Sequence, residues 1–177
     1  MAQPIGKWSY TKGLHELGNG CYAYLQPDGG WGWSNAGLVV DGGESMLVDT
    51  LFDLKLTREM LDTMHRAEPK AAARIGALVN THSNGDHCFG NQLVTGAEII
   101  ASKACAEEME LEGGAKRLAD SKRNASQMGE TGEFFARILA PFDFEGIDVS
   151  MPTLTFEGEM HTRQDAKILA ELRFVTR

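Results

Sequence analysis

Residues 80–91 hold the side chains whose types and spacing are best suited to chemistry. Their sequence, Asn-Thr-His-Ser-Asn-Gly-Asp-His-Cys-Phe-Gly-Asn, places the imidazoles of His82 and His87 and the carboxylate of Asp86 within six residues. Imidazole nitrogens and carboxylate oxygens suit zinc, iron or manganese in an open site. The segment follows an apolar run at residues 75–80, and a loop at the end of a strand can direct several side chains to one point. The pattern therefore indicates a metal site.

A plainer interpretation of the same segment stays open. Histidines and an aspartate in a polar loop also form ordinary turn hydrogen bonds without binding an ion. The two interpretations differ in whether the three side chains converge, which depends on the elements that position them.

The chain before this segment is expected to form an antiparallel meander. Apolar and β-prone residues predict strands at residues 21–25 and 45–48, and the apolar end of residues 35–40 is β-prone as well. Asp-Gly-Gly-Glu at residues 41–44 is a strong hairpin turn, because glycine adopts positive φ at little steric cost.

From Leu54 the apolar spacing becomes that of a helix, which Glu68-Pro69 is expected to end. Residues 75–80 and 98–101 are then predicted as strands, and Ser102 as the N-cap of a helix to about residue 112. This alternation predicts that His82, Asp86 and His87 converge at the C-terminal end of the strand at residues 75–80.

The second half of the chain is more polar and less regular. Residues 113–140 are expected to be a helical insertion within a single domain of residues 1–177. Pro141 begins an extended stretch, and residues 154–159 predict a strand that runs into a turn. The final segment, residues 165–177, is compatible with either helix or strand.

Composition limits the partners that the protein is expected to have. With 177 residues and 42% hydrophobic side chains, the chain is long enough for one ordinary core. Its 17 basic and 25 acidic residues give a net charge of −8, which argues against nucleic acid or an anionic membrane as a partner. No apolar run approaches the roughly 20 residues of a spanning helix, and no leader is apparent, so a cytoplasmic protein is expected.

Cysteine chemistry does not add to the candidate site. Cys21, Cys88 and Cys105 are an odd number without a close Cys-x-x-Cys pair. They indicate neither a disulfide framework nor a cysteine zinc site.

The sequence His82-x-Asn84-x-Asp86-His87 after a strand resembles the His-x-His-x-Asp-His hallmark of the metallo-β-lactamase-fold hydrolases. The opening meander and Leu-Val-Asp-Thr at residues 47–50 are also similar to this family, so the resemblance covers most of residues 13–112. It implies an α/β fold in which two β-sheets form an αβ/βα sandwich flanked by helices. The C-terminal half of that sandwich is short or incomplete in this chain.

The resemblance also implies a ligand set. His82 matches the first ligand of one metal site, while Asp86 and His87 match ligands of a second. Asn84 stands in the place of the middle histidine, where an amide oxygen binds zinc less well but still orients a water or a substrate. His161, followed by Thr-Arg-Gln-Asp, is similar to a later ligand of the family and is a further candidate.

Three other residues are assigned to the surroundings of the site. Asp49 is expected to hydrogen-bond a ligand imidazole or the loop, since the family carries a similar acidic residue there. Trp31 and Trp33 are candidates for the mouth of a substrate pocket, with packing in the core as the alternative.

The activity implied by the resemblance is hydrolysis by a metal-bound hydroxide. The expected cofactor is one or two Zn²⁺ ions, with iron or manganese as alternatives, and Asp86 is the expected catalytic residue. The substrate would be a small ester, lactone, thioester or amide. The competing hypothesis is a non-catalytic structural or interaction module of the same fold, which Asn84 and the missing later ligands favour.

Half of a sandwich leaves one face of a sheet uncovered. Either the chain is a shortened product or fragment, or a second copy completes the fold. Because large exposed apolar faces are rare in monomers, a homodimer or higher oligomer is expected.

Overall fold

A seven-stranded mixed sheet runs through the molecule in simple chain order, from β1 to β7. The computed structural model describes residues 10–27, 30–111, 114–164 and 167–173. The antiparallel part of the sheet comprises β1 (Gly13–Gly18), β2 (Cys21–Leu25), β3 (Ala36–Asp41) and β4 (Glu44–Val48). The expected meander is thus confirmed, and Gly42 and Gly43 form the β3–β4 turn with φ values of 63° and 90°.

The parallel part of the sheet follows β4 and includes the loop of interest. Its elements are α1 (Leu54–Ala67), β5 (Ala77–Val79), α2 (Gly85–Cys88), η1 (Asn91–Leu93), β6 (Glu98–Ser102) and α3 (Lys103–Leu111). Strands β4, β5 and β6 pair in parallel, so the segments after β4 and β5 lie at the same edge of the sheet. Ser102 caps α3 as expected, because its Oγ accepts a hydrogen bond from the N–H of Cys105 at 3.1 Å.

The expected helical insertion consists of two helices joined by a short turn. They are α4 (Gly114–Arg123), η2 (Ala125–Gln127) and α5 (Gly129–Ile138). Residues 139–153 then return to β7 (Leu154–Phe156), which pairs in parallel with β6. On this return the side chains of Leu139, Phe142 and Phe144 are buried, which fixes the insertion against the sheet and α1.

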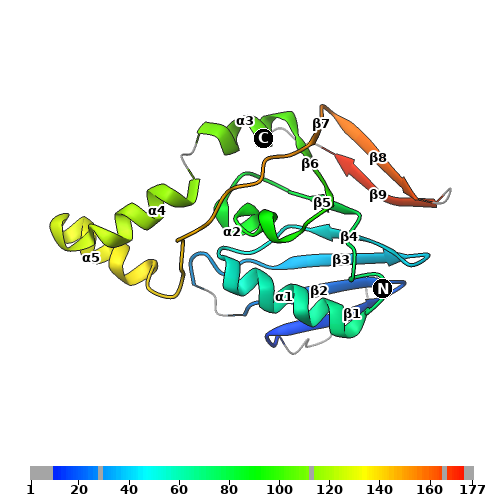
Figure 1. The fold of residues 1–177 in the computed structure, drawn as a ribbon, viewed down its shortest axis with the longest axis horizontal. Coiled ribbons are helices and arrows are strands. Elements are labelled where there is room, and N and C mark those ends of the chain that lie inside the picture. The colour runs from blue at the N-terminus through cyan, green and yellow to red at the C-terminus, as the bar shows by residue number, and fades with distance from the viewer. Residues whose placement is uncertain (1–9, 28–29, 112–113, 165–166, 174–177) are drawn as a thin grey trace, which may run out of the picture.

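The described chain ends in a separate antiparallel pair, β8 (Glu159–Gln164) and β9 (Lys167–Arg173). The final segment, for which both helix and strand were open, is therefore strand over residues 167–173. Figure 1 shows this pair beyond β7, at the opposite side of the molecule from α4 and α5.

The core lies mainly on the face of the sheet that the helices cover. Its fully buried side chains include Leu38, Leu47, Leu78, Met60 and Met64. Strand residues that alternate with these point to the opposite face, as the period of two in a strand requires. There Met46, Val79 and Ile100 form a smaller buried cluster.

None of the helices in the described ranges is long and apolar enough to cross a membrane.

Candidate metal centre

Asp49 is the carboxylate at the centre of the candidate site. It directly follows β4, it is buried, and its φ of 61° is a left-handed conformation that is costly for a residue with a side chain. Its Oδ1 accepts a hydrogen bond from the backbone N–H of Thr81 at 2.7 Å. Its Oδ2 lies 2.7 Å from the Thr81 hydroxyl and 2.9 Å from Nδ1 of His87. Asp49 therefore ties the end of β4 to the loop after β5.

These hydrogen bonds determine which nitrogen of each histidine is available. An ionised carboxylate only accepts, so the Thr81 hydroxyl donates its one hydrogen to Asp49. The same hydroxyl oxygen lies 2.8 Å from Nδ1 of His82 and must accept from it. His87 donates from Nδ1 directly to Asp49. Both neutral rings thus carry their hydrogen on Nδ1 and present the lone pair of Nε2.

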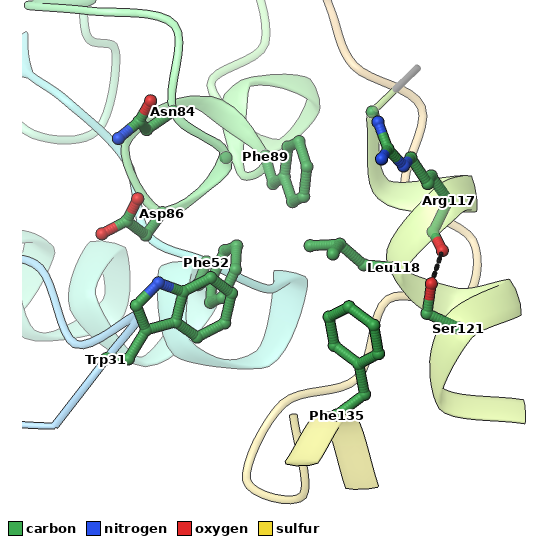
Figure 2. Close-up of a pocket in the computed structure, with 11 residues that line it drawn as sticks. Trp31, Phe52, Asn84, Asp86, Phe89, Arg117, Leu118, Ser121 and Phe135 are labelled. Carbon is green, nitrogen blue, oxygen red and sulfur yellow. Dashed lines mark hydrogen bonds between the residues drawn. The ribbon is translucent and has the colours of Figure 1, made fainter. Parts of the chain in front are cut away.

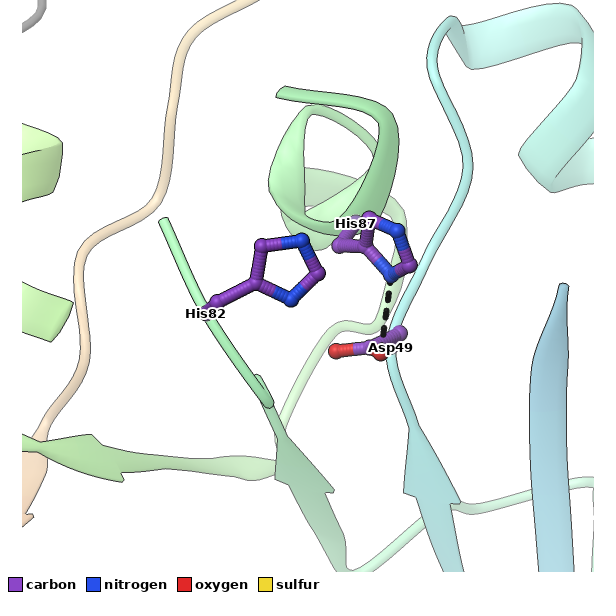
Figure 3. Close-up of side chains that lie close together, drawn as sticks. All are labelled: Asp49, His82 and His87. Atoms are coloured by element: carbon purple, nitrogen blue, oxygen red, sulfur yellow. Dashed lines mark hydrogen bonds and ion pairs between the residues drawn. The ribbon is translucent and has the colours of Figure 1, made fainter. Parts of the chain in front are cut away.

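The two imidazoles lie beside each other, with ring centroids 4.1 Å apart. Asp49, His82 and His87 each offer a donor atom, and these atoms all lie within 4.8 Å of one another (Figure 3). Within the described ranges, this is the one group of three or more metal-ligating side chains gathered so closely. The predicted convergence at the end of β5 is therefore seen for both histidines.

Asp86 lies beside His87 but outside the close group. Its Oδ2 is 3.6 Å from Nε2 of His87. Two ligands of one tetrahedral zinc, with bonds of about 2.0–2.1 Å, are separated by roughly 3.3 Å. The Asp86–His87 pair therefore needs little movement to hold one ion.

The backbone of α2 is fixed by buried amides that the sequence analysis did not single out. Asn80 Nδ2 donates to the carbonyl of His87 at 3.0 Å, and Asn91 Nδ2 donates to Oδ1 of Asn80 at 2.8 Å. The N–H of Thr50 donates to the same His87 carbonyl at 2.9 Å. The sequence has an asparagine at each end of residues 80–91, which could have suggested such a network. Thr50, which donates to the same carbonyl, is 37 positions from His87, so the sequence pattern does not connect them.

Gly85 is required for packing. A Cβ on Gly85 would lie 2.4 Å from the ring of Phe89, which is closer than real contacts allow. Gly85 begins α2, and its lack of a side chain leaves room for the ring of Phe89 at this point.

Electrostatics at His87 favour its charged form in the absence of metal. Burial lowers the pKa of His87, but the hydrogen bond and charge of Asp49 and the charge of Asp86 outweigh this. The pKa of His87 is consequently raised above its ordinary value of 6.5. A metal ion must displace this proton from the ring.

A cavity of about 390 Å³ opens next to the candidate ligands. Asn84 and Asp86 line one side of it, and Trp31 lies at its edge, 54% exposed, with its ring against Phe52 (Figure 2). Asn84 is exposed and makes no capping bond to α2. Trp33 is placed differently, because it packs on the buried ring of Phe142.

The donor set fits a divalent metal ion of the zinc class. His82 and His87 offer Nε2 and Asp86 offers a carboxylate oxygen, which are ligand types of catalytic zinc sites. Both oxygens of Asp49 already accept hydrogen bonds, so its chemistry is that of a partner that orients the rings.

His161 lies in β8, opposite Glu171 on β9, rather than in a loop. Its side chain is outside the part of the chain that the structure describes. Its role as a ligand stays a prediction.

Comparison with known proteins identifies the family. The sequence matches the family model of the metallo-beta-lactamase superfamily over residues 29–166, which is more than half of the chain. The chain therefore belongs to the metallo-beta-lactamase superfamily. The resemblance drawn from the sequence is confirmed. No curated protein sequence matches the chain.

Solved structures of the same superfamily share its fold. A metallo-beta-lactamase from Pontibacter korlensis superposes with a TM-score of 0.58 at 14% identity, over 90% of this chain and 58% of that one. The protein TMB-1 gives a TM-score of 0.53 at 19% identity, over 86% of this chain and 56% of its own. For a metallo-beta-lactamase from Hirschia baltica the TM-score is 0.48 at 24% identity, over 56% of this chain and 47% of that one.

The chain thus spans between 47% and 58% of these three structures. The expected α/β metallo-β-lactamase fold is confirmed by the family match and by the Pontibacter korlensis likeness.

Proposed function

We propose that this protein is a metal-dependent hydrolase of a small ester, lactone, thioester or amide. The proposed cofactor is one or two Zn²⁺ ions, with iron or manganese as alternatives. The observation that carries the proposal is the orientation of two imidazoles by Asp49, which contacts His87 directly and His82 through the Thr81 hydroxyl. Nε2 of His87 then lies 3.6 Å from the carboxylate of Asp86. Membership of the superfamily supports the same conclusion.

The residues of the site have distinct roles in this proposal. His82 binds one ion through Nε2, and His87 with Asp86 binds a second or completes the first. When bound, zinc lowers the pKa of its water toward about 7 and polarises a carbonyl. Hydrolysis then adds the oxygen of water to the carbonyl carbon, breaks the bond to the leaving atom and delivers a proton to it.

The cavity beside Asp86 is the proposed substrate site. Its volume of about 390 Å³ lies in the range of small-molecule pockets. The aromatic rings of Phe52 and Phe89 contribute to its wall, so an apolar part of the substrate can pack there while its carbonyl faces Asp86.

A non-catalytic module of the same fold is the second candidate. Asn84 favours it, because an exposed amide stands where the hallmark has a histidine ligand. The two candidates differ in whether the purified protein retains metal.

The test is metal content and hydrolysis after substitution of Asp86. Protein purified without added metal is expected to contain zinc by elemental analysis and to cleave an activated ester such as p-nitrophenyl hexanoate. Asp86→Ala is expected to lose most metal and reduce hydrolysis at least about 100-fold, because the oxygen ligand beside His87 is removed. Asp62→Ala on the exposed side of α1 is the matched control.

Asn84→His extends the same experiment in the opposite direction. A histidine in this place restores the hallmark and is expected to slow the loss of zinc to a chelator. If Asp86→Ala leaves both metal content and hydrolysis unchanged, the hydrolase proposal is wrong and the module replaces it.

A further inference from the structure

The cavity beside Asp86 has two polar ends separated by apolar side chains. Figure 2 shows Asn84 and Asp86 on one side and Arg117 and Ser121 on the other. The apolar lining between and around them comes from Trp31, Phe52, Phe89, Leu118 and Phe135. The end with Asp86 adjoins the candidate metal centre, because Asp86 lies 3.6 Å from Nε2 of His87. The opposite end has no role in the chemistry proposed above.

Helix α4 presents one of its faces to this cavity. The lining residues Gly114, Arg117, Leu118 and Ser121 are spaced by three, one and three positions along α4. Residues three and four apart lie on one side of a helix, so Arg117 lies on the same face of α4 as the other residues that line the cavity. The Ser121 hydroxyl donates to the Arg117 carbonyl at 2.8 Å, which leaves the guanidinium of Arg117 out of that contact.

Arg117 differs from Lys122 and Arg123 of α4 in its contacts. Lys116 also forms no ion pair within 4.0 Å among the described residues, but it does not line this cavity. Arg123 forms ion pairs with Asp120 and Glu145, and Lys122 donates to the carbonyl of Phe142 at 2.5 Å. Among the residues that the structure describes, Arg117 has no ion-pair partner within 4.0 Å, although the protein carries an excess of acidic side chains. A guanidinium has five donors in a planar fork that matches a carboxylate.

We infer that Arg117 is the anion-binding residue of the substrate pocket. The substrate class is then an ester, lactone, thioester or amide with an apolar body and a carboxylate at the end remote from the cleaved bond. This inference rests on the proposed function for the reaction, but the binding of the anion does not. The aromatic wall holds the apolar body, and Arg117 selects the charged over the neutral substrate.

A pair of esters tests the selection during turnover. Mono-p-nitrophenyl adipate and p-nitrophenyl hexanoate share a leaving group and a six-carbon acyl chain, and differ in the terminal carboxylate. The native protein is expected to show the higher kcat/KM with the adipate ester. Arg117→Gln is expected to lower the ratio of the two kcat/KM values about fivefold, as for an ion pair at an exposed site. Arg117→Lys keeps the charge and should lower it less.

The matched control is Lys116→Gln, which removes an exposed positive charge one position away on the same helix but not from the wall of this cavity. It is expected to leave the ratio unchanged. If Lys116→Gln and Arg117→Gln lower the ratio of kcat/KM values equally, the preference for the charged ester comes from the general positive charge of the helix and not from a contact with Arg117. That result overturns the inference.

A binding measurement separates this inference from the proposed function. Phenylbutyrate and its neutral amide are titrated calorimetrically into the purified protein, Arg117→Gln and Asp86→Ala. The native protein is expected to bind the carboxylate more tightly, and Arg117→Gln to remove that difference. In the contrary outcome, Asp86→Ala loses the difference in affinity between phenylbutyrate and its amide, and Arg117→Gln keeps it. The carboxylate would then bind at the metal, and the inference would be overturned.

The two failures have different signatures. A protein that cleaves no ester yet binds phenylbutyrate through Arg117 contradicts the hydrolase and supports the anion site. A protein that cleaves both esters equally, with no effect of Arg117→Gln on either assay, supports the hydrolase and contradicts the anion site.

Discussion

Asp49 is the residue on which the geometry of the candidate centre depends. Its Oδ2 accepts from His87 Nδ1 at 2.9 Å, and through the Thr81 hydroxyl it also sets the ring of His82. In Asp49→Asn an amide nitrogen replaces one carboxylate oxygen, so a donor faces a donor at Thr81 or at His87. Relief of that conflict at His87 moves its hydrogen to Nε2 and blocks the metal-binding nitrogen. We expect zinc affinity to fall about 10–100-fold, measured by competition with a chromophoric chelator.

The same substitution should change the titration of His87. In the metal-free native protein its pKa lies above 6.5, because the hydrogen bond and charge of Asp49 and the charge of Asp86 outweigh burial. Asp49→Asn keeps the burial and loses the main favourable contributions, so the midpoint of the His87 ring signal in an NMR titration should move down. A midpoint that stays unchanged would show that Asp49 does not contact the ring.

The raised pKa of His87 also makes the stability of the metal-free protein depend on pH. The interaction of charged His87 with Asp49 stabilises the metal-free fold fully below pH 6.5 and is lost as the pH rises through the raised value. The difference in unfolding free energy between the native protein and Asp49→Asn should therefore shrink above that pH.

The N-cap of α1 is hydrogen-bonded to residues 139–153, the segment between α5 and β7. Oδ1 of the buried Asp53 caps the helix by accepting from the N–H of Leu56 at 2.7 Å, and Oδ2 accepts from the N–H of Asp143 at 3.1 Å. One carboxylate thus holds α1 and the segment after α5 together, and that segment supports the wall of the cavity.

Asp53→Ala removes both interactions at once. Loss of a helix cap costs about 0.5–2 kcal/mol, and the N–H of Asp143 loses its partner as well, so we expect about 2 kcal/mol less stability in urea unfolding. Asp53→Asn retains one accepting oxygen and should lose less. A value for Asp53→Ala within about 0.5 kcal/mol of the native protein would contradict this role of the cap.

The whole molecule presents a sheet face that the helices do not cover. Met46, Val79 and Ile100 are buried there, while the surrounding apolar side chains are only partly buried: Val39, Val48, Ala77, Leu154, Phe156 and Met160. In the described ranges the short β8–β9 pair is the structure that follows β7, and Met160 of β8 packs against this face. A continuous apolar surface of this kind favours association.

We therefore expect a homodimer or higher oligomer. Sedimentation velocity at micromolar concentration should show a species heavier than one chain. Val48→Lys places a charge on this face and should shift the distribution toward the monomer, whereas Lys55→Ala on exposed α1 should not. A well-folded monomer for the native protein throughout this range would contradict the expectation.

Much of the architecture could be predicted from sequence because it depends on local chemistry. The β3–β4 turn follows from glycines at positive φ, and α1 ends at Ala67 with Glu68 as its C-cap, directly before the proline that was expected to stop it. The types and spacing of His82, Asp86 and His87 likewise indicated a metal site, and the hallmark indicated the family. These signals lie within a few residues of one another.

Tertiary structure decided how distant residues meet. Asp49 and His87 are 38 positions apart, and their contact depends on the parallel pairing of β4 with β5. The sequence left Trp31 and Trp33 equivalent, but Trp31 lines the cavity and Trp33 packs on Phe142. Arg117 is exposed on α4, and only the tertiary structure places it in the wall of the cavity that Asp86 also lines. Hydrophobic periodicity specifies which face of an element is buried, but not which other element covers it, because that choice depends on packing across the whole chain.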